Sequence, residues 1–276
     1  MQLFRPELSL AAGVSVLAGQ ILASGRLPSL GVGVLGLICI FALTGSALIL
    51  NDYFDYEVDQ INVPDRPLPS GAVSRAEALW LTAVTVIIGI AAAAVLGINV
   101  LIFAVILLAI SFCYNWRFKQ TGLPGNLMVS TSVALAFILG AACVHVPFNK
   151  VVWTFSAMAF FLDLGEEIAG DAMDMEGDKK RNSRSIALVK GKKYALRVSL
   201  ALWSVVVGLS LLPVIFGWMG IIYMTTILPA EVLLVYFSIR LLKSQDPESG
   251  RRAMRGIYLA VLVGLSAFLI GQLLGK

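Results

Sequence analysis

SLGVGVLGLICIFALTGSALILNDYFDYEVD, residues 29–59, is the stretch that decides the fold of this chain. Its first part, residues 29–50, has no charged side chain and is long enough to cross a bilayer, which takes about 20 apolar residues. Its last part, residues 51–59, carries four carboxylates directly after that apolar run. A carboxylate within or beside a bilayer is costly, and such groups usually have a function. We therefore predict a membrane protein with a functional site at the end of this helix.

The rest of the chain has the same character. Hydrophobic residues make up 58% of the 276 residues, charged residues only 14%, and the mean hydropathy is +0.87; soluble domains carry about 25% charged residues. We predict an all-α membrane protein, a bundle of nine transmembrane helices with cytoplasmic cap-like loops, forming a single domain over residues 1–276. The predicted spans are 8–25, 29–50, 76–94, 96–113, 124–145, 151–170, 194–212, 214–239 and 254–274.

The distribution of basic residues orients these helices. If the N-terminus is cytoplasmic, 18 of the 21 Lys and Arg residues lie on that side, and only Arg26, Lys150 and Lys276 lie on the other. This bias is the one that the positive-inside rule describes. The sequence therefore predicts a multi-pass protein of the cell membrane with a cytoplasmic N-terminus. No basic stripe is interleaved with aromatic residues, so a nucleic-acid partner is not expected, and no obligatory protein partner is evident.

Carboxylates gather in two short segments. Of the 17 Asp and Glu residues, five lie in 52–65 and seven in 163–178, and the topology places both segments on the cytoplasmic face. In the first segment Asn51, Asp55 and Asp59 are spaced i, i+4 and i+8 and share one helical face. Three oxygen ligands in a row repel each other unless a cation lies between them, and Mg²⁺ suits a few carboxylates completed by water and phosphate oxygens.

The second segment repeats this pattern. Glu167, Asp171, Asp174 and Asp178 step by four, three and four residues and again form one acidic stripe, with Lys179 and Arg184 following. The alternative in both segments is a solvated, charge-balanced helix end. Because residues 46–80 and 166–200 share this arrangement of apolar helix, acids and basic loop, they resemble a loose internal duplication.

Basic and aromatic residues follow the first stripe. The loop 61–71 has three prolines around Arg66, which makes Arg66 a well-placed anion ligand. Ser74 and Glu77 then form a capping box that opens the next helix. The next cytoplasmic loop supplies Tyr114, Arg117 and Lys119; the two cations either bind substrate or only set the topology.

These motifs together carry a resemblance to a known family. Asn51-Asp-x-x-Asp55-x-x-x-Asp59, the loop Asp65-Arg-Pro-Leu-Pro-Ser-Gly71 and Asp174-x-x-x-Asp178 resemble the UbiA superfamily of intramembrane prenyltransferases over the whole chain. The resemblance implies a transferase that binds Mg²⁺ and an isoprenyl diphosphate through its two acidic motifs and acts on a lipid-soluble acceptor in the membrane. It implies that the metal ligands are Asp55, Asp59, Asp174 and Asp178, with Asn51 also in the core of the site; Asp171 is a further catalytic candidate by its place in the second stripe. By the same likeness Arg66 and Lys119 bind the diphosphate, with Tyr114, Lys179 and Arg184 as further substrate-binding candidates.

Within the superfamily, the amino-acid sequence around Arg66 and Asp174 is most similar to that of the enzymes that form digeranylgeranylglyceryl phosphate. Those enzymes transfer a geranylgeranyl group from its diphosphate to the hydroxyl of geranylgeranylglyceryl phosphate in archaeal-type ether lipid synthesis. An aromatic quinone precursor or a chlorophyllide is the alternative acceptor. Two departures from the pattern are Glu166, where a basic residue is expected, and the loop 180–184, which lacks Gly-Ile.

The residues also suggest parts of a mechanism. Phe54, Phe112 and Tyr114 are candidates to stabilise an allylic cation, or they are interfacial anchors. Asp171 is a candidate to accept the proton of the acceptor hydroxyl, and Lys179, Lys180 or Arg184 to bind its phosphate. Glu231 lies inside the eighth span and either lines the acceptor pocket or bonds a neighbouring helix.

A cation transporter is the rival from another class of protein. A transporter would place ionisable groups near the middle of the bilayer and break its helices there. Here both acidic clusters are predicted at one face, which favours an enzyme.

Overall fold

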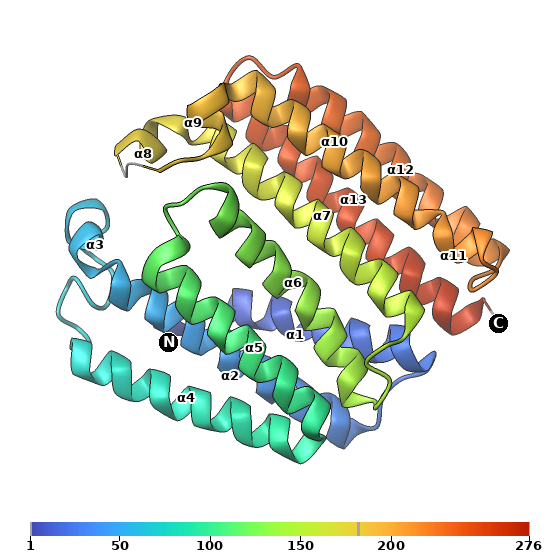
Figure 1. The fold of residues 1–276 in the computed structure, drawn as a ribbon, viewed down its shortest axis with the longest axis horizontal. Helices are drawn as coiled ribbons and strands as arrows, with labels where there is room; N and C mark the ends of the chain where they lie inside the picture. The colour runs from blue at the N-terminus through green and yellow to red at the C-terminus, as the bar shows by residue number, and fades with distance from the viewer. Residues whose placement is uncertain (1, 181–182, 276) are drawn as a thin grey trace. The chain divides into compact units, whose positions relative to one another are not determined.

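The structure is a computed structural model that describes residues 2–180 and 183–275. Within these ranges the regular elements are helices, and nine of them have 16 residues or more (Figure 1). These nine are α1 (Pro6–Ser24), α2 (Leu30–Phe54), α4 (Arg75–Leu96), α5 (Ile98–Cys113), α6 (Leu123–Cys143), α7 (Lys150–Met173), α10 (Lys192–Ser210), α12 (Ile221–Leu242) and α13 (Pro247–Leu274). The shorter elements are η1 (Gln2–Phe4), α3 (Tyr56–Asn62), η2 (Tyr114–Phe118), α8 (Met175–Lys180), α9 (Ile186–Lys190) and α11 (Leu212–Ile215).

Each predicted span overlaps one of the nine long helices, which confirms the all-α membrane class. Among the described residues, eight helices are long and apolar enough to cross a membrane. The ninth, α7, has sufficient length but carries Asp163, Glu166, Glu167 and Asp171, and it is not one of the eight. The prediction was also wrong about the start of the eighth span, because the chain turns at Gly217, with φ +64°, and α12 begins only at Ile221.

The chain divides into two compact units. The first consists of residues 1–117 and 135–148, and the second of residues 118–134 and 149–276, so that α6 contributes to both. The expectation of one domain over residues 1–276 stays a prediction.

In the first unit, α2 packs against α1, α4 and α5 around an apolar core. Its fully buried members include Val16, Cys39, Val100 and Leu139. α1 and the second half of α6 approach closely because Gly140 has no side chain: a Cβ there would lie 2.2 Å from the carbonyl oxygen of Val16. Small residues at helix contacts are typical of membrane proteins, where packing drives helix association.

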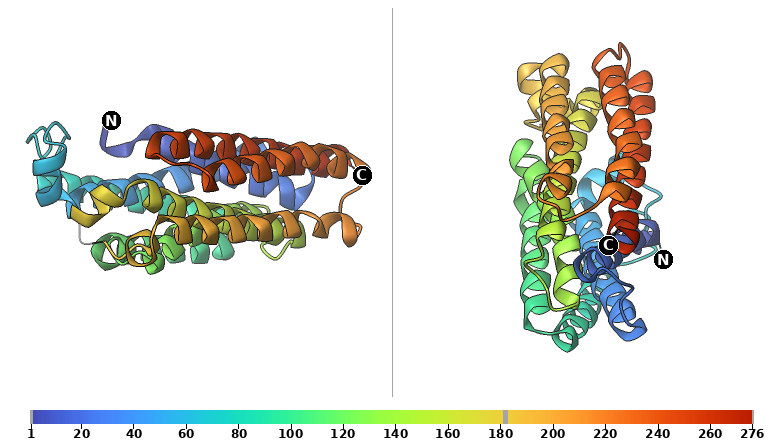
Figure 2. Two further views of the ribbon diagram at one scale, coloured as in Figure 1. Left: turned by 90° about the horizontal axis from the view of Figure 1, so that it is seen from above. Right: turned by 90° about the vertical axis from the view of Figure 1, so that its right-hand side faces the viewer.

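In the second unit, α10 packs against α7 and α12, and α12 lies beside α13 (Figures 1 and 2). Aromatic side chains fill the contacts: the ring of Phe268 lies 4.9 Å from that of Phe155 and 4.7 Å from that of Tyr223, in edge-to-face geometry. Trp203 is buried on α10, and its Nε1 donates a hydrogen bond of 3.1 Å to the carbonyl oxygen of Leu162 on α7.

Candidate active site

The first acidic motif lies where α2 ends and α3 begins. Asp55 separates the two helices, yet the backbone hydrogen bonds continue across it. The N–H of Asp55 donates to the carbonyl oxygen of Asn51 at 3.0 Å, and the N–H of Asp59 donates to that of Asp55 at 2.8 Å. The four-residue spacing of Asn51, Asp55 and Asp59 is therefore kept in the helical backbone.

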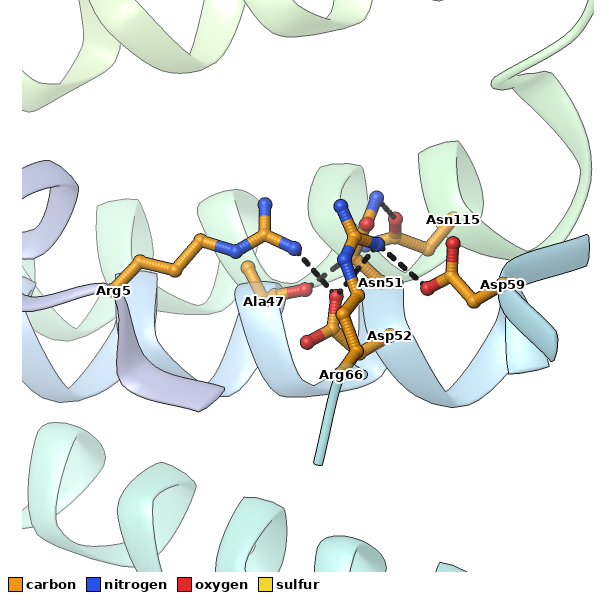
Figure 3. A network of polar contacts seen from close by, with 7 residues as sticks. All are labelled: Arg5, Ala47, Asn51, Asp52, Asp59, Arg66 and Asn115. Carbon is orange, nitrogen blue, oxygen red and sulfur yellow. Dashed lines mark hydrogen bonds and ion pairs between the residues drawn. The ribbon is translucent and has the colours of Figure 1, made fainter. Parts of the chain in front are cut away.

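Two arginines pair with carboxylates of this motif (Figure 3). Arg66 Nη1 lies 2.6 Å from Asp59 Oδ2 and 3.6 Å from Asp52 Oδ1. Arg5, just before α1, places Nη2 2.6 Å from the same Oδ1 of Asp52. Asp52 is 2% exposed and Asp59 5% exposed, so both charges need such partners. The structure thus brings together Asp59 and Arg66, which were predicted as a metal ligand and a diphosphate ligand, and adds Arg5 and Asp52.

Asn51 is oriented by a second asparagine. Its Nδ2 donates to Asn115 Oδ1 at 2.9 Å, and Asn115 Nδ2 in turn donates to the carbonyl oxygens of Ser111 at 3.0 Å and Ala47 at 3.3 Å (Figure 3). Asn115 and Tyr114, the latter predicted to bind substrate, belong to η2, a single π-helical turn. Such turns occur often at functional sites. η2 and the end of α5 are thereby tied to α2.

Aromatic rings cover the same end of the first unit. The ring centroids of Phe54 and Phe112 are 6.1 Å apart, in edge-to-face geometry. Arg75 lies over Tyr53, with its guanidinium carbon 4.5 Å from the ring centroid.

The predicted capping box is confirmed, since the N–H of Glu77 donates to Ser74 Oγ at 3.2 Å and the N–H of Ser74 donates to the Glu77 carboxylate at 2.7 Å. α4 therefore begins at a fixed point after the proline loop.

The second acidic motif, in the second unit, has the same backbone arrangement. α7 ends at Met173 and α8 begins at Met175, so Asp174 lies at a break as Asp55 does. The N–H of Asp174 donates to the carbonyl oxygen of Gly170, and the N–H of Asp178 to that of Asp174, both at 3.0 Å. This likeness in hydrogen bonding supports the predicted internal duplication.

Neighbouring helices donate hydrogen bonds to the carboxylates of α7. Asn126 Nδ2 donates to Asp171 at 3.0 Å, and Ser130 Oγ donates to Asp163 at 2.8 Å, both from the first half of α6. The hydroxyl of Tyr258, on α13, donates to Glu166. Glu166, the residue that departs from the expected basic pattern, is therefore paired within the bundle.

Lys119 and Arg184 belong to two loops of the second unit that meet. The N–H of Arg184 donates to the carbonyl oxygen of Gln120 at 3.3 Å. Gly122 adopts φ +72°, and a Cβ there would lie 2.2 Å from the carbonyl oxygen of Arg184. The contact therefore requires glycine, and it joins the turn that holds Lys119 to the loop that holds Arg184. Lys179 is exposed on α8, while the side chain of Lys180 and residues 181–182 lie outside the described part of the chain.

One further cation pairs with the second motif. Arg251, in the first turns of α13, has Nη2 3.3 Å from Asp174 Oδ1, and both side chains are more than half exposed. Sequence analysis missed Arg5, Asn115, Asn126, Arg251 and Tyr258 as partners of the acidic motifs. Of these, only Asn115 carried a local signal, because it lies between Tyr114 and Arg117.

The structure favours one of the two roles considered for Glu231. Ser210 Oγ, at the end of α10, donates to the Glu231 carboxylate on α12. The hydroxyl of Tyr223 donates to the carbonyl oxygen of Ser210 at 2.7 Å. Glu231 is therefore part of a hydrogen-bonded contact between α10 and α12.

Comparisons with known proteins agree with this architecture. The model of the UbiA prenyltransferase family matches residues 12–267. The digeranylgeranylglyceryl phosphate synthase of Thermococcus kodakarensis is 32% identical over 273 residues, which cover 99% of this chain and 97% of that protein.

Two solved structures are also similar. One, described as giving structural and mechanistic insights into digeranylgeranylglyceryl phosphate synthase in membranes, has a TM-score of 0.86 at 29% identity, covering 99% of this chain and 96% of that one. A UbiA homologue from Archaeoglobus fulgidus bound to DMAPP and Mg²⁺ shares the fold, with a TM-score of 0.71 at 20% identity, covering 97% of this chain and 98% of that one. Both acidic motifs and the proline loop lie within the matched residues, and the chain belongs to the UbiA prenyltransferase family.

Proposed function

We propose that this membrane-embedded prenyltransferase is a digeranylgeranylglyceryl phosphate synthase. It would transfer a geranylgeranyl group from geranylgeranyl diphosphate to the hydroxyl of geranylgeranylglyceryl phosphate. The observation that carries the proposal is the likeness, at about full length, to proteins of that name in both sequence and fold. Membership of the UbiA family also makes the transporter alternative unnecessary, because the family accounts for both acidic motifs.

The residues of the two motifs suit Mg²⁺. Across the described ranges, no group of three or more Asp, Glu, His or Cys side chains is placed to hold a metal ion alone. Mg²⁺ in proteins usually binds one or two carboxylates and completes its octahedral shell with water and substrate phosphates. Each motif offers such a pair of hard oxygen ligands, one at a helix break and one on the short helix that follows. We assign Asp55 and Asp59 in the first unit, and Asp174 and Asp178 in the second, as ligands; bound Mg²⁺ would neutralise charge on the leaving diphosphate.

The protein's own groups perform the remaining work. Arg66 and Lys119 would bind the diphosphate while the bond between its oxygen and the prenyl C1 breaks. The acceptor's hydroxyl oxygen then forms the ether bond to C1 and releases its proton. Asp171, oriented by Asn126, is the assigned proton acceptor, and Phe54 and Phe112 would stabilise positive charge on the prenyl group.

We place this chemistry at the cytoplasmic face. The excess of Lys and Arg on the side of the N-terminus supports a cytoplasmic N-terminus, and both acidic motifs fall on that side. Both substrates carry long apolar chains, so they would reach the site from the bilayer.

A donor and acceptor screen with purified protein and Mg²⁺ tests the proposal. Geranylgeranyl diphosphate is offered with geranylgeranylglyceryl phosphate, with 4-hydroxybenzoate and with a chlorophyllide. We expect an ether product from the first acceptor; product from 4-hydroxybenzoate alone would contradict the assignment.

Paired variants test the metal ligands. Asp55→Ala and Asp174→Ala should each lower turnover about 100- to 1,000-fold, as expected when a group that stabilises charge in the transition state is lost. Glu57→Ala and Glu176→Ala remove exposed acids from the same two segments and should retain activity. Equal activity within either pair would refute the assigned role.

A further inference from the structure

A cavity beside the first acidic motif brings Arg66, assigned above to the diphosphate, together with Arg5, which has no role in the function described so far. Its volume is about 380 Å³, and it is lined by Arg5, Asp52 and residues 62–67 of the proline loop, including Arg66. The buried Asp52 uses one oxygen, Oδ1, to hold both guanidinium groups, Arg5 at 2.6 Å and Arg66 at 3.6 Å (Figure 3). Two cations from distant parts of the sequence thus line one cavity.

Most hydrogen-bond donors of these two arginines are available to a ligand. In the described part of the chain, Arg5 makes side-chain polar contacts only through Nη2, and Arg66 only through Nη1. A guanidinium group has five N–H donors in a planar arrangement that matches the oxygens of a phosphate. The two guanidinium groups pair with the two buried carboxylates of Asp52 and Asp59, and each keeps further donors that these pairs do not use.

The walls of the cavity are fixed by a single apolar cluster. Leu3, Ile49 and Leu68 pack together in the core, and each lies two or three residues from Arg5, Asp52 or Arg66. Arg5 has the left-handed backbone conformation φ 37°, ψ 70°, directly before Pro6, where extended backbone is preferred. Strained conformations of this kind persist where the surroundings hold them, and they gather at binding sites. The two arginines are therefore held in place before any ligand arrives.

From these observations we propose that the cavity is a phosphate subsite, in which Arg5 and Arg66 together bind one phosphate group of a substrate. Asp52 offsets one of the two positive charges, and Asp65 is exposed, where water screens its charge. Asp59, the other partner of Arg66, does not line the cavity and is an assigned metal ligand. The inference rests on the proposed function for the identity of the phosphate, which belongs to either the prenyl diphosphate or the phosphate monoester of the acceptor.

The competing explanation is that Arg5 serves only to neutralise Asp52. A comparison of Asp52→Asn with the double variant Arg5→Gln/Asp52→Asn separates the two roles, because neither protein has an unpaired Asp52 charge. The probe is sn-glycerol 1-phosphate, titrated calorimetrically into the full chain in detergent micelles, with glycerol as the phosphate-free control. Arg26→Gln removes an exposed arginine at the other end of α1 and should bind the probe as the unmodified protein does.

We expect the double variant to bind the probe about 10- to 100-fold more weakly than Asp52→Asn, as the loss of one charge-assisted donor group predicts. Equal affinities would overturn the subsite. Steady-state kinetics of the same pair then identify the source: a rise in the KM of the acceptor alone assigns its monoester, and a rise in the KM of the prenyl diphosphate alone assigns the donor. If neither KM changes, the cavity is not used in turnover and the proposal is wrong. If the unmodified protein fails to use the proposed acceptor, the proposed function fails, while the titration still decides the phosphate subsite.

Discussion

Replacing Gly122 by alanine should damage activity much more than stability. Gly122 joins the turn that holds Lys119 to the loop that holds Arg184, and an added Cβ would lie 2.2 Å from the carbonyl oxygen of Arg184. Carbon–oxygen contacts are normally at least about 3.3 Å long. The two loops would therefore have to separate by roughly 1 Å, and both hold residues assigned to substrate phosphates.

Gly191 provides the matched control. It has φ +88°, positive like the +72° of Gly122, but a Cβ there meets no atom within 4 Å. Alanine at either position should lose about 1–3 kcal/mol of stability, because a positive φ is unfavourable for a residue with a Cβ. Only Gly122→Ala also displaces the loops, and a displacement of about 1 Å can reduce a catalytic rate by up to roughly 100-fold.

The measurement is kcat/KM for prenyl transfer beside the apparent Tm in detergent. We expect similar decreases of Tm in the two variants and a decrease of kcat/KM of about 10- to 100-fold in Gly122→Ala only. Similar kcat/KM values in the two variants would show that the loop contact does not position the site. A much lower Tm in Gly122→Ala would show that the contact is part of the core.

Gly140→Ala should destabilise the first unit by about 1–3 kcal/mol, as overpacking does, because its Cβ would lie 2.2 Å from the carbonyl oxygen of Val16; an unchanged Tm would contradict the close helix contact. Chelation of Mg²⁺ should abolish prenyl transfer and added Mg²⁺ should restore it, so full activity in excess chelator would refute the metal assignment. Asp246 caps α13 by accepting a hydrogen bond from the N–H of Ser249, which lowers the pKa of Asp246 below its ordinary 3.8. The cap therefore stabilises the fold when the pH is above 3.8, and this stabilisation is lost as the pH falls further and Asp246 takes up a proton. The difference in Tm between the unmodified protein and Asp246→Ala should be present at neutral pH and shrink below about pH 3.8. A difference in Tm that stays constant with pH would count against this role.

The sequence predicted the helices well because apolar runs of membrane-spanning length leave few alternatives. Even α7 was found, since all of its acids except Asp163 lie near one end of an apolar run. The start of α12 was misplaced because residues 214–220 are apolar as well, and hydropathy does not detect the turn at Gly217.

The candidate site was predicted only in part. Helical periodicity placed Asn51, Asp55 and Asp59 on one face, but no local preference indicated that a helix would break at Asp55 or at Asp174. The partners of the carboxylates were also out of reach: Arg5 and Asp52 are 47 residues apart, and Tyr258 and Glu166 are 92 residues apart. Such pairs form through tertiary packing, which a single sequence does not specify.

The carboxylates of α7 also bear on how the chain enters the membrane during synthesis. An acidic residue near the centre of a helix opposes insertion through the translocon by about 2.5–3.5 kcal/mol, so α7 is a poor candidate to enter the lipid alone. Asn126 and Ser130, which donate to two of its carboxylates, lie on α6 and are made before it, whereas Tyr258 on α13 is made after it. We infer that α6 and α7 leave the translocon as a hairpin, and that α7 reaches its final hydrogen bonding only when α13 has been synthesised.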